Sequence, residues 1–401
     1  MRYVKSRLFD NKGLHMSRKV TFDVAGDPDT INFGIGQPSQ DLLPVELMRT
    51  AAERFFACAN PQELNYGDRP GDPTFRETLA AFLTGEYGAQ VAADDLFVTA
   101  GNSQALDFVC SVFTRPGDTI IVEEPSYFLA FRIFADHGLN IVSVPLDQHG
   151  LDIDALEIIL ERTNPALLYT IPSYQNPGGQ SMSGARRRRL AELSRRHGFT
   201  IVADEVYQML WYDRPPPPAL GTLIDRGNVL SLGSFSKILA PGARLGWIQA
   251  SERLMKRLLD SGVINSGGSF NQFTSLVVRE AIKSGLQAAF VQQLRETYAR
   301  RVDVMDQALQ THFGGRARWR KPCGGYFFWL EFGAGMDTTA LRAHADDYQT
   351  GFQPGQNSSS GGGLKNCLRL SFAHYGEEDI RAGVERLGQL FDEFECQGRA
   401  K

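Results

Sequence analysis

Short apolar runs alternate with amphipathic stretches of helical length from about residue 96 to residue 250, and no other feature constrains the fold as strongly. The runs are rich in leucine and β-branched residues, which is typical of strands buried on both faces. The expected strands are Leu96–Thr99, Thr119–Val122, Ile141–Val144, Ala166–Ile171, Phe199–Ala203, Val229–Leu232 and Leu245–Ala250. Alternation of this kind predicts an α/β fold with a mainly parallel sheet covered by helices.

Polar residues stand just past the carboxyl ends of several of these strands. They are Asn102 and Ser103, Tyr127, Asn176, Asp204 with Tyr207, and Ser234 to Lys237. Any one of them could be a turn residue, which is the common role of Asn, Ser and Asp. Open α/β sheets bind ligands in the crevice outside the carboxyl ends of their strands, so loops with compatible chemistry on one edge predict a ligand site.

Lys237 is the only lysine between Lys19 and Lys256, and it stands among serines and glycines. A lysine amine becomes a nucleophile when burial or a neighbouring cation lowers its pKa, and its usual product is a Schiff base. The flanking serines and Arg244, seven residues on, are side chains that a phosphate group binds. The stretch Ser231–Trp247 therefore predicts a lysine that carries pyridoxal phosphate.

The composition narrows the class of protein. A net charge of -4 gives no electrostatic reason to expect nucleic acid or an anionic membrane as partner. The five cysteines are scattered without a CxxC pair, which indicates a reducing compartment and argues against a zinc site. No apolar run has the length of a membrane span, and the N-terminus lacks the apolar core of a signal peptide. We expect a cytoplasmic enzyme without a metal, and a solvated helix face at Arg186–Arg189.

The alternation of strands and helices stops in the last third of the chain, and the length of 401 residues favours two domains. The elements expected there are a long helical region Gln272–Leu309, strand material at Trp319–Phe332, a helix Asp337–Asp346, a loop over 349–366, a strand Cys367–Tyr375 and a helix from Glu377 to about Glu395. We expect a large cofactor-binding domain over 45–290 and a small α+β domain over 291–401. Residues 1–44 are expected to form an arm and a segment that closes over substrate.

Six motifs of this chain occur in one family in the same order and spacing. They are TAGNSQAL, EEPSYF, SYQNPGG, ADEVY, GSFSKILAPGARLGW and NCLRLSF. Over nearly its whole length the chain resembles the fold-type I pyridoxal phosphate enzymes, specifically the class I/II aminotransferases with the aspartate aminotransferase-like fold. Its nearest resemblance is to the branch of kynurenine/2-aminoadipate aminotransferases and MocR effector domains. The resemblance implies pyridoxal 5′-phosphate as cofactor and a homodimer with shared active sites.

The resemblance also implies a role for each site residue. The implied catalytic residues are Lys237, which forms the internal aldimine and shuttles a proton, Asp204 at the pyridinium nitrogen, and Tyr127 stacked on the ring. The other implied cofactor ligands are Asn102, Ser103, Ser234, Ser236 and Arg244 at the phosphate, Asn176 and Tyr207 at the phenolate oxygen, and Tyr66 from the partner subunit. Arg369 is implied to hold the substrate α-carboxylate, with Gly36 and Asn176 beside the substrate. Asn102 stands where the family often has serine or threonine.

Three functions remain open from the sequence. An aminotransferase and a pyridoxal phosphate lyase or synthase share this lysine, aspartate and tyrosine set, because the cofactor supplies the carbanion chemistry and the pocket decides which bond breaks. A non-catalytic ligand-sensing domain would need a DNA-binding domain, for which the first 30 residues are too few. Apolar residues near Phe33, Leu42 and Phe352 predict an α-amino acid with an aromatic, aliphatic or long side chain. The loop 356–365 leaves the specificity open.

Overall fold

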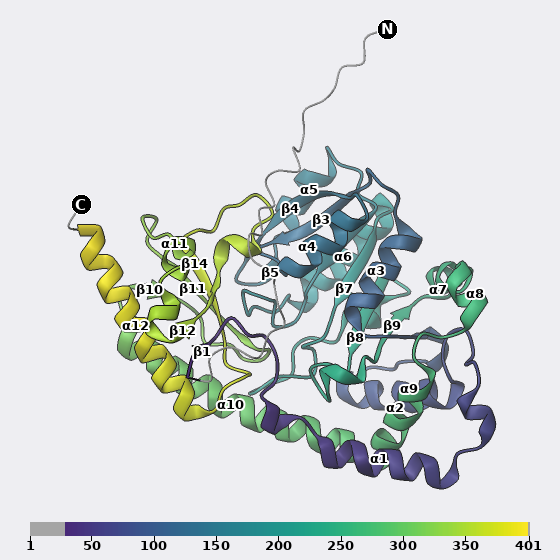
Figure 1. Ribbon diagram of the computed structural model, residues 1–401. Helices are drawn as coiled ribbons and strands as arrows, with labels where there is room; N and C mark the ends of the chain where they lie inside the picture. The colour runs from purple at the N-terminus through teal and green to yellow at the C-terminus, as the bar shows by residue number, and fades with distance from the viewer. Residues whose placement is uncertain (1–28, 400–401) are drawn as a thin grey trace.

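An eight-stranded sheet forms the centre of the larger part of the molecule (Figure 1). This computed structural model describes residues 29–399, so the arm expected at the N-terminus lies mostly outside the described residues. In spatial order the strands are β2 (Leu96–Thr99), β9 (Gly246–Ala250), β8 (Val229–Ser234), β7 (Thr200–Asp204), β6 (Leu167–Thr170), β3 (Thr119–Glu124), β4 (Asn140–Asp147) and β5 (Gly150–Leu151). Strands β8 to β4 run parallel, and antiparallel pairs occur only at the two edges. The mainly parallel sheet is confirmed.

The side chains of the central strands alternate between two apolar cores, one on each face of the sheet. Ile120, Val122 and Val202 belong to one core, whereas Ile121 and Ile201 belong to the other. The helices whose residues fill the first core include α2 (Pro73–Tyr87), α3 (Asn102–Phe113) and α4 (Phe128–Asp136), and α5 (Ile153–Leu160) and α6 (Gly184–His197) fill the second. This alternation explains why the strands read as nearly continuous apolar runs.

The strand order reverses between β3 and β6. From β3 the chain continues to its neighbour β4, then returns to the other side of β3 as β6 and moves outward through β7 and β8. The connections after β3 and β6 therefore diverge, and a crevice opens where the strands end. Tyr127 follows β3 and Asn176 follows β6, so both residues lie at this reversal.

A second sheet, antiparallel and four-stranded, lies in the smaller part of the molecule. Its order is β10 (Ala317–Arg318), β11 (Phe327–Phe332), β14 (Cys367–Ser371) and β13 (Gln353–Pro354). The helices α10 (Leu286–Phe313) and α12 (Glu377–Arg399) pack beside it, and Phe313, Phe332 and Phe391 meet between them. Figure 1 shows α10 running along the bottom of the view from the larger part to the smaller. A parallel pair, β1 (Ile31–Asn32) with β12 (Thr350–Gly351), ties the N-terminal segment to this smaller part.

The remaining helices are α1 (Val45–Cys58), α7 (Glu252–Leu259), α8 (Gly262–Gly267), α9 (Gln272–Lys283) and α11 (Thr338–Arg342). The helical region expected over Gln272–Leu309 is confirmed, and Gly285, in the left-handed conformation (φ 77°), divides it into α9 and α10. The loop expected over 349–366 is wrong in part, since it contains β12 and β13.

The arginine run at the start of α6 is only partly solvated. Arg187 is buried, donates to the carbonyl oxygens of Pro172 and Pro218 at 2.9 and 3.0 Å, and lies 3.5 Å from the Glu205 carboxylate. The expected solvated face is therefore wrong for Arg187, because its position on α6 turns it toward the sheet.

Candidate active site

A cavity of about 820 Å³ lies at the carboxyl ends of β3, β6, β7 and β8, where the smaller sheet faces the larger one. The predicted site residues that line it are Gly36, Asn102, Ser103, Tyr127, Asn176, Asp204, Tyr207, Ser234, Ser236, Lys237, Arg244 and Arg369. Residues far apart in the sequence thus converge on one space, as expected from the motifs. Tyr66 does not line the cavity of its own chain.

Lys237 follows β8 and extends its amine into the cavity. Its Nζ donates to the carbonyl oxygen of Gly36 at 2.8 Å and lies 5.2 Å from the centre of the Tyr326 ring. Burial, aided by the positive charge of Arg369, lowers the pKa of Lys237 to about 8, although Asp204 opposes the shift. A substantial fraction of this amine is therefore neutral and nucleophilic near pH 8.

Asp204 ends β7 with both carboxylate oxygens hydrogen-bonded. Asn102 Nδ2 donates to Oδ1 at 2.7 Å, and the Tyr169 hydroxyl donates to Oδ2 at 2.8 Å. Burial raises the pKa of Asp204, while the hydrogen bonds from Tyr169 and Asn102 act in the opposite direction. These donors stabilise a carboxylate that can accept a hydrogen bond from a cationic ring nitrogen.

The N-terminus of α3 forms one end of the cavity together with Arg244. Gly101 precedes the helix with φ 86°, and a Cβ at this position would lie 2.9 Å from Arg244 Nη2. Glycine thus allows the guanidinium to lie beside the free N–H groups of the first helical turn. The hydroxyls of Ser234 and Ser236 lie 3.0 Å apart at the same cavity. Free N–H groups, hydroxyls and a guanidinium suit a phosphate group.

Arg369 lies on β14, on the opposite wall of the cavity. Its Nη1 donates to Asn176 Oδ1 at 3.0 Å and its Nη2 to the Gly34 carbonyl oxygen at 2.9 Å. The Nε is buried without a partner, and the guanidinium lies 4.1 Å from the centre of the Phe327 ring. Burial lowers the pKa of Arg369 to about 10. A buried cation with an unpaired donor suits a carboxylate ligand.

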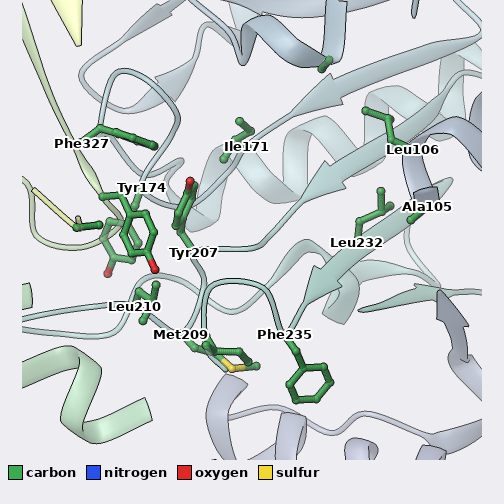
Figure 2. Close-up of a cluster of buried hydrophobic side chains, with 14 of the residues drawn as sticks. Ala105, Leu106, Ile171, Tyr174, Tyr207, Met209, Leu210, Leu232, Phe235 and Phe327 are labelled. Carbon is green, nitrogen blue, oxygen red and sulfur yellow. The ribbon is translucent and has the colours of Figure 1, made fainter. Parts of the chain in front are cut away.

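Tyrosine and apolar side chains form the base of the site. Figure 2 shows Tyr207 among Ile171, Leu210 and Phe327, and its ring centre lies 6.0 Å from that of Phe327. Burial raises the pKa of Tyr127 to about 12 and raises that of Tyr207 as well. Both hydroxyls therefore remain protonated and able to donate at neutral pH.

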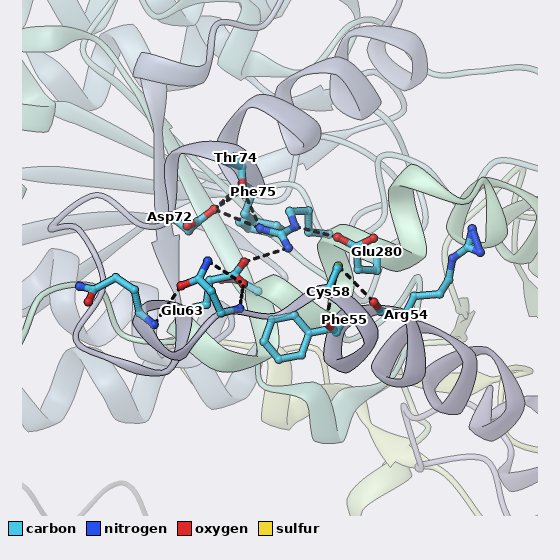
Figure 3. Close-up of polar contacts among 12 residues, drawn as sticks. Arg54, Phe55, Cys58, Glu63, Asp72, Thr74, Phe75 and Glu280 are labelled. Carbon is cyan, nitrogen blue, oxygen red and sulfur yellow. Dashed lines mark hydrogen bonds and ion pairs between the residues drawn. The ribbon is translucent and has the colours of Figure 1, made fainter.

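Tyr66 lies on the surface, and the residue is 83% exposed. It follows the 3-10 turn Pro61–Leu64, which Arg279 of α9 anchors through Glu63 at 3.1 Å (Figure 3). Arg279 also contacts Glu280 at 2.9 Å and the Thr74 hydroxyl at 2.8 Å. A polar network around the buried Arg279 thus holds the segment before Tyr66 in place, while the tyrosine itself lies outside its own cavity.

Two buried side chains of the site were not predicted as site residues. Tyr169 contacts Asp204, as described above, and Glu123 accepts from the backbone N–H of Ile171 and from Gln175 Nε2, both at 3.1 Å. Gln175 also donates to the Pro125 carbonyl oxygen at 2.8 Å, so this network joins the loops after β3 and β6. Burial raises the pKa of Glu123 to about 7. Glu123 is the first residue of EEPSYF and directly follows the apolar residues of β3, and a carboxylate at the end of a buried strand is the signal that could have identified it.

No cluster of three or more His, Cys, Asp or Glu side chains suited to a metal ion occurs within the described part of the chain. None of the helices in residues 29–399 combines the length and hydrophobicity of a membrane span.

The residues present fit pyridoxal 5′-phosphate. The cavity combines a buried lysine of lowered pKa, a hydrogen-bonded aspartate, and a glycine-lined helix N-terminus beside an arginine. The unpaired Nε of Arg369 is left for a substrate carboxylate. Each of these groups matches one part of the cofactor or of an amino acid joined to it.

Comparisons with known proteins agree with this chemistry. The family model for aminotransferase class I and II matches residues 28–387. The aromatic-amino-acid aminotransferase 1 of Thermococcus litoralis is 33% identical over 91% of this chain and 88% of that protein. The multiple substrate aminotransferase of Thermococcus profundus has a TM-score of 0.87 at 30% identity, over 97% of this chain and 98% of that one.

A third relative carries a derivative of the cofactor. The α-aminoadipate aminotransferase of Thermus thermophilus, solved with N-(5′-phosphopyridoxyl)-L-leucine, has a TM-score of 0.83 at 30% identity, over 92% of this chain and 94% of that one. The family model spans most of the chain, and the relatives match nearly end to end. This chain therefore belongs to the class I and II aminotransferases, which use pyridoxal 5′-phosphate to move the amino group of an α-amino acid to an α-keto acid.

Proposed function

We propose that the protein transaminates α-amino acids with aromatic, aliphatic or long side chains, with Lys237, Asp204 and Arg369 as the principal residues. The observation that carries the proposal is the convergence of the partly buried Lys237 with the buried Asp204 and Arg369 on one cavity. Bound pyridoxal 5′-phosphate supplies the carbonyl group and the electron-withdrawing ring that the reaction needs.

Lys237 has two tasks in this proposal. Its neutral amine attaches the cofactor, and after substrate displaces it, the freed Nζ takes the proton from the substrate Cα as a general base. The pKa of about 8 supports both tasks, because a proton acceptor works best when its pKa is close to the working pH.

We infer the other cofactor contacts from the residues that line the cavity. Asp204 would accept from the ring nitrogen, Tyr127 would stack on the ring, and Asn176 with Tyr207 would donate to the phenolate oxygen. The phosphate would bind the first turn of α3 at Asn102 and Ser103, together with Ser234, Ser236 and Arg244.

Arg369 holds the substrate α-carboxylate, and the N-terminal segment closes over it. The carbonyl oxygens of Gly34 and Gly36 accept hydrogen bonds from Arg369 and Lys237. Attachment of the cofactor removes the Lys237 donor and the substrate carboxylate takes over the Arg369 donor, so we expect this segment to shift as the two bind. We also propose that the chain consists of an N-terminal segment (1–44), a large cofactor-binding domain (45–290) and a small domain (291–401). Helix α10 connects the two domains.

Apolar side chains support the proposed substrate range. They line the cavity at Ile35, Phe128, Leu129, Ile133, Phe327 and Phe352. Arg342 also lines the cavity and pairs with Asp346 at 2.9 Å, so a cation is available for a long side chain with a polar end. The names of two relatives, aromatic-amino-acid and α-aminoadipate aminotransferase, cover these two kinds of substrate.

A homodimer with shared active sites is part of the proposal. Tyr66 is exposed and outside its own cavity, which supports its use at the phosphate of the partner subunit. Val45, Phe56, Leu64 and Phe273 are exposed apolar side chains on α1, α9 and the turn before Tyr66, and such a surface suits a subunit interface. A cytoplasmic location is proposed as well, supported by the free thiols of the described cysteines.

A panel of amino acids with one α-keto acid acceptor tests the proposed function. We expect turnover of aromatic, aliphatic and long-chain amino acids, with one new amino acid formed from the acceptor for each substrate consumed. Ammonia release without consumption of the keto acid would contradict transamination. Turnover of dicarboxylic amino acids alone would contradict the proposed substrate range.

A further inference from the structure

We propose that Asn102 is a positioning residue for Asp204 and forms, with Tyr169, a two-donor clamp on that carboxylate. Its side chain then does not serve as a phosphate ligand. The inference rests on the proposed function, in which Asp204 pairs with the ring nitrogen of the cofactor.

The hydrogen bonds define the clamp. Asn102 Nδ2 donates to Asp204 Oδ1 at 2.7 Å and, more weakly, to the Leu232 carbonyl oxygen at 3.3 Å. The Tyr169 hydroxyl donates to the other carboxylate oxygen at 2.8 Å. The amide orientation follows from chemistry, because the flipped amide would set its oxygen against both the carboxylate and the Leu232 carbonyl.

The fold brings the three residues together. Tyr169 pairs with Val202 in register, and Asp204 lies two residues beyond Val202 on the same face of β7. Tyr169, Val202 and helix α3 share the same apolar core, and Asn102 is the first residue of α3. With its side chain bound to Asp204 and Leu232, Asn102 offers a phosphate only its backbone N–H.

The clamp offsets the cost of burial. Burial raises the pKa of Asp204, and the two hydrogen bonds act against that shift, as does the charge of Lys237. Tyr127 and Glu123 also lie close enough to interact electrostatically with Asp204. Only ionised Asp204 favours a protonated ring nitrogen, so the clamp preserves the electron demand of the ring.

The test is an absorbance titration of the bond between Lys237 and the cofactor in the holoenzyme. A ring nitrogen that is protonated less often withdraws less electron density. The pKa of the nitrogen that joins Lys237 to the cofactor therefore rises. We expect Asn102→Ala and Tyr169→Phe each to raise it by about one unit, and the double variant to raise it further. The kcat of each single variant should fall roughly 10- to 100-fold, as for loss of one hydrogen bond to a charged group.

Asn102→Asp keeps the size of the side chain but places a second carboxylate beside Asp204. It should therefore shift the pKa at least as far as Asn102→Ala. Ser111→Ala is the matched control, because Ser111 lies on the same helix and its hydroxyl contacts only the Asp107 carbonyl oxygen. We expect this control to titrate and turn over like the unchanged protein.

The outcomes separate the inference from the function on which it rests. Absence of a cofactor–lysine absorbance band in the unchanged protein would overturn the proposed function. A second outcome is a normal band whose pKa in Asn102→Ala and in Asn102→Asp equals that of the unchanged protein, with weaker cofactor binding as the main effect. This result would overturn the clamp and would indicate that the Asn102 side chain binds the phosphate. Tyr169→Phe changes no group at the phosphate end, so an unshifted pKa in this variant also counts against the clamp.

Discussion

At the scale of single residues, the properties of the site depend on two cations that share one buried space. The charge of Arg369 adds to burial in lowering the pKa of Lys237 to about 8. Burial likewise lowers the pKa of Arg369 to about 10, so the guanidinium still carries its charge at neutral pH. On the proposed roles, the substrate carboxylate would neutralise this charge when it binds, and the basicity of Lys237 would rise at the step in which the proton on the substrate Cα is removed.

The lowered pKa of Lys237 predicts how the cofactor-free protein reacts with pyridoxal 5′-phosphate. The neutral amine is the nucleophile, so the rate of attachment should rise with pH through about 8 and level off above it. Stopped-flow absorbance measures this rate over roughly pH 6 to 10, a range that extends about two pH units on either side of the Lys237 pKa. A midpoint near 10, the value of an exposed lysine, would contradict the burial argument.

Arg369→Lys tests the guanidinium fork. Lysine keeps the charge but cannot form two parallel hydrogen bonds with a carboxylate, so we expect KM for the amino acid to rise roughly tenfold or more. The cofactor should still attach to Lys237, because lysine at position 369 keeps the positive charge that helps to lower the pKa of Lys237. An unchanged KM would assign the substrate carboxylate to another group.

Sequence motifs predicted which residues meet in the cavity, because βα alternation places the carboxyl ends of parallel strands at one edge of the sheet. They did not predict the direction of the Asn102 side chain, since that depends on how the first turn of α3 lies over the end of β7. The burial of Arg187 was missed for a similar reason. Four consecutive arginines look alike in sequence, and only the packing of α6 decides which one turns inward.

At the scale of elements, one glycine separates α9 from α10. Gly285 adopts φ 77° with open space around it, and no local apolar pattern marks the break. The very short strands β12 and β13 escaped prediction because their partners β1 and β14, and not their own sequences, hold them in place.

Two alanine substitutions give opposite results at this scale. Gly285→Ala should destabilise the protein by about 1 kcal/mol, because an L-residue is strained in the left-handed conformation. Gly85 lies inside α2 with open space where a Cβ would stand. Gly85→Ala should therefore stabilise the protein by about 0.5 to 1 kcal/mol. Thermal unfolding of both variants beside the unchanged protein measures the difference. Midpoints that move in the same direction would contradict the assignment of the helix break.

At the scale of the whole molecule, the proposed role of Tyr66 would make the active site a property of a pair of chains. The Arg279 network fixes the turn that leads to Tyr66, and Leu64 in that turn is an exposed apolar side chain. On this proposal, the cavity of a single chain lacks the hydroxyl that its partner supplies.

Mixed dimers test the sharing of sites. Tyr66→Ala and Lys237→Ala chains are each expected to be impaired alone. A mixed dimer contains one site with Lys237 from one chain and Tyr66 from the other, so random mixing should restore about one quarter of the normal number of sites. Size-exclusion chromatography and activity after mixing measure this recovery. No recovery, despite formation of mixed dimers, would place Tyr66 at the site of its own chain or at none.

A single half-reaction followed by absorbance tests the role of Lys237 most directly. The holoenzyme, mixed with a reactive amino acid and no keto acid, should lose the absorbance of the cofactor–lysine bond and gain that of the amine form of the cofactor. Addition of an α-keto acid should reverse the change. Lys237→Ala should show neither the starting band nor the conversion. Conversion and turnover that survive in Lys237→Ala would contradict the account.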